Sequence, residues 1–142
     1  MNFESIIEPE TRRAYEETEY RVIGESPFVL RIGVASQELA TVQVATGVLS
    51  SAFVTACNPF GAVLTDEENS RRQVELAQEL KTRSLSFIEG VGQHPNNNWP
   101  GESSYLVLGL NLEAARTLGH RLEQNAIVWA GDDAVPQLVL LK

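Results

Sequence analysis

The sequence predicts a single α/β domain in which flanking helices pack on a mixed central β-sheet. Short apolar runs rich in β-branched residues, typical of buried strands, alternate with segments that have helix caps and helical apolar spacing. The chain has 142 residues, the usual size of one domain, and no linker divides it. We expect residues 1–142 to make one domain, with an N-terminal surface helix in residues 1–20 and the α/β core in residues 21–142.

Six segments have the composition of strands and four that of helices. The apolar segments predict strands over residues 28–34, 52–55, 85–89, 105–110, 125–130 and 137–141. Start and stop signals predict helices over residues 9–20, 36–46, 66–83 and 111–123. The segment 36–46 is ambiguous, because its β-branched residues favour a strand. Since Ser36 suits an N-cap and Gly47 a helix stop, we interpret it as a helix.

The stretch of residues 51–72 organises the chain. Its strand runs into a turn at Asn58 and Pro59, because proline disfavours helical geometry at the residue before it. Thr65 is then a good N-cap, and Glu68 stands at capping-box spacing. Ligands often bind where a strand, a polar loop and a helix N-terminus follow one another, because loop amides and the helix dipole converge there.

The long helix that follows is expected to bury Val74, Ala77 and Leu80, with Leu76 beside them. The segment of residues 90–101 combines several glycines and prolines with three consecutive asparagines. It therefore predicts a loop.

Charge and hydropathy exclude several classes of partner. The formal net charge of −8 disfavours duplex nucleic acid and anionic membranes. No apolar run approaches the roughly 20 residues of a membrane span. The N-terminal residues lack the order of a signal peptide. We therefore expect a soluble, cytoplasmic protein.

The cysteine and the histidines give little support to metal or nucleophile chemistry. Cys57 is the sole cysteine, so an intrachain disulfide and a cysteine-rich metal site are excluded. His94 and His120 lack ligand spacing, and we expect neither a metal nor a cofactor. Ser103 and Ser104 occur without a nucleophile-elbow motif. Catalysis by Cys57 would need a base such as His94, and packing is the simpler role for this thiol.

Four motifs point to a known family. They are VTACNP (54–59), ENSRRQ (68–73), WPGESSYLVLGL (99–110) and QNAIVW (124–129). With these motifs the chain resembles a bacterial family of domains of unknown function, family 3293, from about residue 20 to residue 141. That family has no established activity, so the resemblance implies no mechanism. It implies only which residues match the family's motif positions, and we take these as the candidate ligand-binding residues: Thr55, Asn58, Asn69, Arg72, Trp99, Glu102, Ser103, Gln124 and Asn125.

Two of these residues, Arg72 and Glu102, have two interpretations each. Asn69 and Arg72 are three residues apart and share one helix face. Arg72 suits bidentate binding of a carboxylate or phosphate, or an internal salt bridge to Glu102 or Glu68. Glu102 suits a general base or a ligand acceptor, or an acceptor of loop amides.

Two functional hypotheses follow. In the first, the polar cluster beside the strand ends binds a polar or anionic small molecule, such as a nucleotide-like metabolite, with catalysis left undecided. In the alternative, the chain is a protein-interaction module whose polar residues lock its loops together while an acidic exterior contacts a protein partner. The sequence predicts no oligomeric state.

Overall fold

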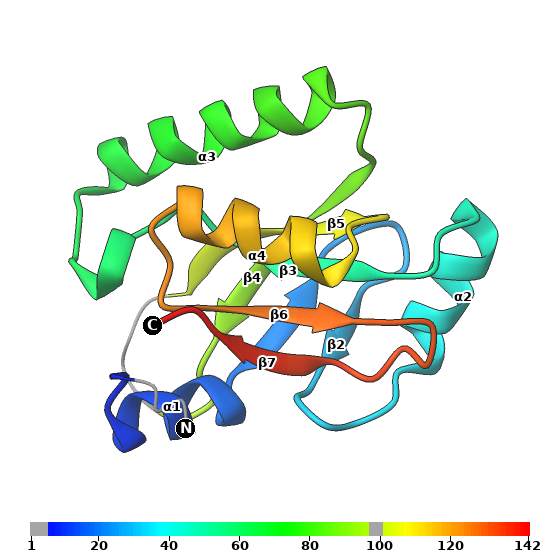
Figure 1. Ribbon diagram of the computed structural model, residues 1–142, viewed down its shortest axis with the longest axis horizontal. Coiled ribbons are helices and arrows are strands. Elements are labelled where there is room, and N and C mark those ends of the chain that lie inside the picture. The colour runs from blue at the N-terminus through cyan, green and yellow to red at the C-terminus, as the bar shows by residue number, and fades with distance from the viewer. Residues whose placement is uncertain (1–5, 97–100) are drawn as a thin grey trace.

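One antiparallel β-sheet of seven strands forms the centre of the molecule (Figure 1). The computed structural model describes residues 6–96 and 101–142. The strands are β1 (Glu19–Val22), β2 (Phe28–Leu30), β3 (Ser51–Val54), β4 (Phe87–Gln93), β5 (Glu102–Leu108), β6 (Ala126–Ala130) and β7 (Gln137–Leu140). The helices are α1 (Pro9–Glu17), α2 (Gln37–Thr46), α3 (Asp66–Thr82) and α4 (Leu112–Arg121), with a short 3₁₀ turn η1 (Pro59–Gly61).

The strand order is β2-β1-β4-β5-β3-β6-β7. In its middle, the elements β3-α3-β4-β5-α4-β6 form two β-α-β units whose like-directed strands are separated by an antiparallel strand. This split β-α-β arrangement is that of ferredoxin-like folds. The β1–β2 hairpin extends the sheet beyond β4, and β7 extends it beyond β6.

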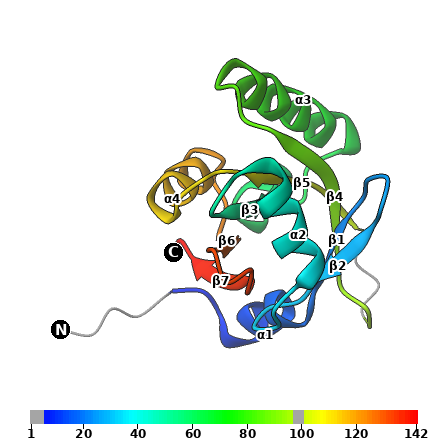
Figure 2. The same cartoon turned by 90° about the vertical axis from the view of Figure 1, so that its right-hand side faces the viewer.

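The two faces of the sheet have separate cores because successive side chains of a strand point to opposite faces. On one face, Leu76 and Leu80 of α3 and Leu118 of α4 pack with Val54. On the other face, Leu39 of α2 packs in a second cluster with Phe53. Figures 1 and 2 both show α3 and α1 on opposite sides of the molecule. The sheet therefore has α3 and α4 on one side and α1 and α2 on the other.

The predicted caps of α2 and α3 are confirmed. Ser36 accepts a hydrogen bond from the amide of Leu39, and Gly47 ends α2 with φ of 73°, a left-handed geometry that glycine adopts freely. Thr65 and Glu68 form a complete capping box at the start of α3. Each segment thus sets its own helix ends through local hydrogen bonds.

The apolar stripe predicted for α3 is confirmed at Leu76 and Leu80 and wrong at Val74. Val74 is 54% exposed, and the buried side chains of α3 are Gln73, Leu76 and Leu80. The buried face of α3 thus includes Gln73, where the apolar pattern predicted Val74. The reason is that Gln73 makes hydrogen bonds to the segment after β3, as described below.

The α/β class is confirmed, and every strand pairing is antiparallel where a mixed sheet was expected. The order of elements along the chain does not show which strand is inserted between two others. The helix predicted for residues 9–20 ends at Glu17, since Thr18 is extended and Glu19–Val22 is strand β1.

The loop predicted for residues 90–101 begins later than expected, because β4 continues to Gln93. Gly90 lies within this strand for a packing reason. A Cβ there would lie 2.6 Å from the Phe53 ring and 2.7 Å from the carbonyl oxygen of Arg21. This glycine therefore permits close packing on Phe53 and does not mark a turn.

Candidate functional site

Asn58 joins the segment after β3 to α3 and β5. Its backbone is left-handed, with φ of 49° and ψ of 64°, a geometry that asparagine tolerates. Its side-chain Oδ1 accepts from the amide of Leu64 at 3.0 Å and from Nδ2 of Asn69 at 2.9 Å. Its Nδ2 donates to Oε2 of Glu102 at 2.9 Å, and its backbone amide donates to Oδ1 of Asn69 at 2.9 Å. Both ends of the Asn58 side chain are therefore engaged.

Arg72 bonds mainly to backbone. Its Nε donates to the carbonyl of Ala56, and its Nη2 donates to the carbonyl of Leu122 at 2.8 Å. The glutamate that it approaches is Glu123, at 3.8 Å, and not either of the two suggested by the sequence. Arg72 thus ties the segment after β3 to the α4–β6 junction, and its guanidinium is largely used within the protein.

Two glutamines complete this connection. Oε1 of buried Gln73 accepts from the amide of Ala56 at 2.6 Å. Nε2 of buried Gln124 donates to the carbonyl of Cys57 at 3.0 Å and to that of Leu122 at 3.2 Å. Sequence reasoning did not select Gln73. Its position three residues before Leu76 and seven before Leu80 was the available signal.

Thr55 and Cys57 bind the backbone of β5. The Thr55 hydroxyl donates to the carbonyl of Ser103 at 2.6 Å and accepts from the amide of Cys57 at 3.0 Å. The thiol of Cys57 lies 3.6 Å from the same carbonyl. Burial raises the pKa of Cys57, which opposes formation of the reactive thiolate. Ser103 takes part in these contacts through its backbone carbonyl, and the residue is exposed to solvent.

A cavity of about 540 Å³ lies between α1 and the sheet. Alternation along the strands directs Phe53 and Thr55 of the β3 segment, and Glu102 and Ser104 of β5, to the sheet face that bounds it. Apolar side chains and polar groups both contribute to the wall. The wall residues on the strands and loops include Tyr20, Phe53, Thr55, Asn58, Phe60, Val63, Gly92, His94, Glu102, Ser104, Gln124, Asn125, Ala126, Val128 and Leu138.

Helix α1 covers this cavity and buries none of its own residues fully. Ala14 and Tyr15 are among its wall residues. The Tyr20 hydroxyl donates to the carbonyl of Tyr15 at 2.6 Å, and Nδ2 of Asn125 donates to the Tyr15 hydroxyl at 3.3 Å. These polar contacts attach the helix to β1 and to the start of β6.

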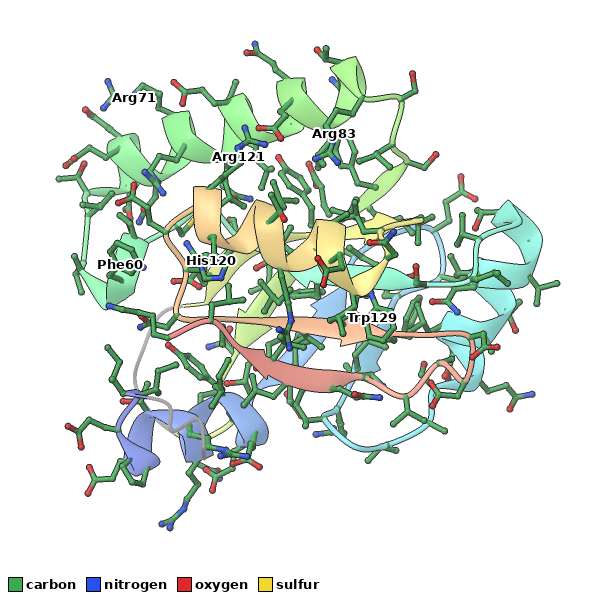
Figure 3. All side chains as sticks on the ribbon, viewed as in Figure 1. Phe60, Arg71, Arg83, His120, Arg121 and Trp129 are labelled. Atoms are coloured by element: carbon green, nitrogen blue, oxygen red, sulfur yellow. The ribbon has the colours of Figure 1, made fainter. Side chains whose placement is uncertain are left out.

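His94 also connects α1 to the sheet. Its Nε2 lies 3.0 Å from a carboxylate oxygen of Glu17, at the end of α1. Figure 3 shows Phe60 on the η1 turn at one end of the molecule, near the C-terminal end of the chain. The Lys142 ammonium lies 4.2 Å from the centre of the Phe60 ring. The wall of the cavity is thus built from residues distant in sequence.

Glu102 is the only Asp or Glu among the described wall residues. Burial raises its pKa, and the hydrogen bond from Asn58 opposes that shift. No arginine or lysine from residues 6–96 or 101–142 belongs to the wall. A partly buried carboxyl group therefore belongs to a described wall that contains no arginine or lysine.

Seven of the nine candidate residues fall into two groups in space. Those on the cavity wall are Thr55, Asn58, Glu102, Gln124 and Asn125. Asn69 and Arg72 lie in the hydrogen-bond network behind the wall, and the Ser103 side chain is outside it. Trp99 lies outside the described residues. The structure also brings Tyr15 and Ser104 to the wall. Ser104 was predictable from its two-residue spacing to Glu102, whereas the sequence marks Tyr15 only as a packing residue of its helix.

Two features are absent from the described part of the chain. No group of three or more histidine, cysteine, aspartate or glutamate side chains there is arranged to hold a metal ion. No helix in the same residues is long and apolar enough to cross a membrane.

Comparison with known proteins identifies a family. No curated protein and no solved structure matches the chain significantly. A family model described as "Protein of unknown function (DUF3293)" matches residues 54–127, from the end of β3 into β6. The match covers α3, β4, β5 and α4 of the split β-α-β core and slightly more than half of the 142 residues, and the chain belongs to this family.

Proposed function

We propose that the protein binds a small organic molecule in the cavity beneath α1. The observation that carries this proposal is a cavity of about 540 Å³ whose apolar surface includes Phe53 and Val128 and whose polar groups include Glu102 and Asn125. Ligand sites commonly have volumes of roughly 300–1,000 Å³ and combine apolar walls with a few polar groups. The single cysteine is free and buried, which fits the expected cytoplasmic location.

The wall favours a polar ligand over an anionic one. Arg72, the candidate for binding a phosphate or carboxylate, bonds to two backbone carbonyls and is not a wall residue. The acidic group on the described wall, Glu102, would repel an anion. A nucleotide-like ligand therefore has less support than a neutral or cationic one.

Protein interaction is the second candidate, and one observation favours it. Phe60 is 50% exposed and Val63 is 90% exposed at the rim of the cavity. Exposed apolar side chains that lie together can contact the apolar part of a small ligand or the surface of a partner protein. A test that obstructs the cavity without changing the rim separates the two.

The test uses Ala14→Trp, which places an indole on the α1 wall of the cavity. The matched control is Glu10→Trp, because Glu10 is exposed on the same helix and is not a wall residue. A fragment library is screened by thermal unfolding, and hits are mapped by NMR. A ligand at about 100 times its Kd stabilises the native state by about 2.7 kcal/mol. For a domain of this size that is a rise of roughly 5–10 °C.

We expect hits to stabilise the wild type and Glu10→Trp, and to lose their effect on Ala14→Trp. Their NMR shifts should centre on wall residues such as Phe53 and Ser104. Hits that bind all three proteins equally, or that shift only resonances far from the cavity, would contradict the proposal.

A further inference from the structure

We propose that the ligand of this cavity carries a positively charged nitrogen group, an ammonium or amidinium, which pairs with the carboxylate of Glu102. This inference rests on the proposed binding function and specifies the chemistry of its ligand.

The first support is the way in which Asn58 orients the carboxylate. Oδ1 of Asn58 already accepts from Leu64 and Asn69, so its Nδ2 must be the atom that points at Glu102. That contact occupies Oε2 of Glu102 at 2.9 Å. The network therefore holds Oε2 of Glu102 in place, and this contact also fixes the direction of Oε1.

The second support is that Oε1 of Glu102 is available. Among the described residues no hydrogen bond or ion pair reaches this atom. The same residues contain no enclosed side-chain oxygen that lacks a partner, so Oε1 is accessible and not sealed in the protein. Because Glu102 is a wall residue, this accessible acceptor can serve a ligand in the cavity.

The third support is the charge of the surroundings. A carboxylate removed from water is stabilised by a nearby cation, and the described wall has no arginine or lysine. Burial raises the pKa of Glu102, which is the response of a carboxyl group that lacks such a cation. A ligand cation would provide the missing charge, and the net charge of −8 attracts cations to the protein.

The fourth support is the apolar surface near this carboxyl group. Tyr20 and Phe53 pack edge to face, with ring centres 5.4 Å apart, and both belong to the wall. Val128 adds a further apolar surface. A short amine with an aromatic or aliphatic body would satisfy both the carboxylate and this surface.

The test compares three probes of similar shape and different charge, which are phenethylamine, phenethyl alcohol and phenylacetate. Each is titrated by NMR into isotope-labelled wild type, Glu102→Gln and the control Glu89→Gln. Glu89 is exposed on β4 and is not a wall residue. In the wild type we expect the amine to bind most tightly and phenylacetate most weakly.

Glu102→Gln should weaken binding of the amine by about tenfold or more while changing binding of the alcohol little, because a hydrogen bond to a charged group is lost. Glu89→Gln should leave all three affinities unchanged. The order of the probes in the wild type tests the inference even if Glu102→Gln folds poorly.

Two results would overturn the inference while leaving the cavity as a binding site. One is equal binding of amine and alcohol to both wild type and Glu102→Gln, and the other is tightest binding of phenylacetate. A failure of the amine to shift any wall resonance at saturating concentration also overturns it. The fragment screen with Ala14→Trp tests the binding function independently of charge.

Discussion

Replacing Arg72 by alanine should destabilise the fold without acting through a ligand. The substitution removes the donors to the carbonyls of Ala56 and Leu122. Ala56 is buried and loses a charged donor, whereas the carbonyl of Leu122 keeps Gln124 at 3.2 Å. The ion pair with Glu123 spans 3.8 Å and involves a half-exposed carboxylate, so it contributes little.

The expected loss follows from these contacts. Hydrogen bonds to charged groups contribute about 1.5–3 kcal/mol each. One such bond is lost at a buried carbonyl and the other is partly replaced, and the Arg72 side chain is 26% exposed to water. We therefore expect the free energy of unfolding to fall by roughly 2–3 kcal/mol, measured by urea denaturation.

The control is Arg71→Ala. Arg71 is exposed and points away from the sheet on the same helix, as Figure 3 shows. Its removal should change the free energy of unfolding by less than about 0.5 kcal/mol. If Arg72→Ala were as stable as this control, the hydrogen bonds of Arg72 would not stabilise the fold, and the structural role assigned to this residue would be refuted. If it also abolished binding of a cavity ligand, Arg72 would regain its role as a ligand residue.

Two further substitutions test the sheet and the carboxyl group. Gly90→Ala should lower the free energy of unfolding by about 1–3 kcal/mol, because the new Cβ would lie 2.6 Å from the Phe53 ring. The control Gly92→Ala should change this free energy little, because the nearest atom to its Cβ would lie at 3.8 Å. Urea denaturation of both variants measures the difference. Glu102→Gln should raise the melting temperature near neutral pH. Burial raises the pKa of Glu102 above its ordinary 4.5, so wild-type stability falls as pH rises from 4.5 through the folded-state pKa. The difference between the two proteins should vanish below about pH 4.5, and a difference independent of pH would contradict this cause.

The capped starts of α2 and α3 were predictable because their causes are local. Thr65 and Glu68 accept hydrogen bonds from each other's amides across three residues, and in α2 the Ser36 side chain accepts from the amide of Leu39. Strand β1 was missed because its short sequence follows a helix without a breaker. The antiparallel insertion of β5 beside β3 was not predictable, since strand neighbours depend on packing between distant segments.

The candidate site was predictable only in part, for a related reason. Polar residues next to strand ends can be selected from the sequence, and Asn58 and Glu102 do meet, at 2.9 Å. The partners of Arg72 and Gln124 are backbone groups. Every residue carries such groups, so no composition or spacing identifies which of them an arginine or a glutamine will reach. The covering of the cavity by α1 was likewise not predictable, because its contacts join residues distant in sequence, such as Tyr15 with Asn125 and Glu17 with His94.

A structural role for the polar cluster does not exclude a place on the cavity wall, because Asn58 belongs to both the network and the wall. Its Oδ1 accepts from α3 and from its own loop, and these bonds orient its Nδ2 toward Glu102. Asn69 and Arg72 therefore act on the cavity indirectly, by holding the segment that carries Asn58. Groups that position an accessible carboxyl group must themselves be fully bonded, since a mobile support would let Glu102 turn toward water. A satisfied hydrogen-bond network behind the wall is thus what a binding site in front of it requires.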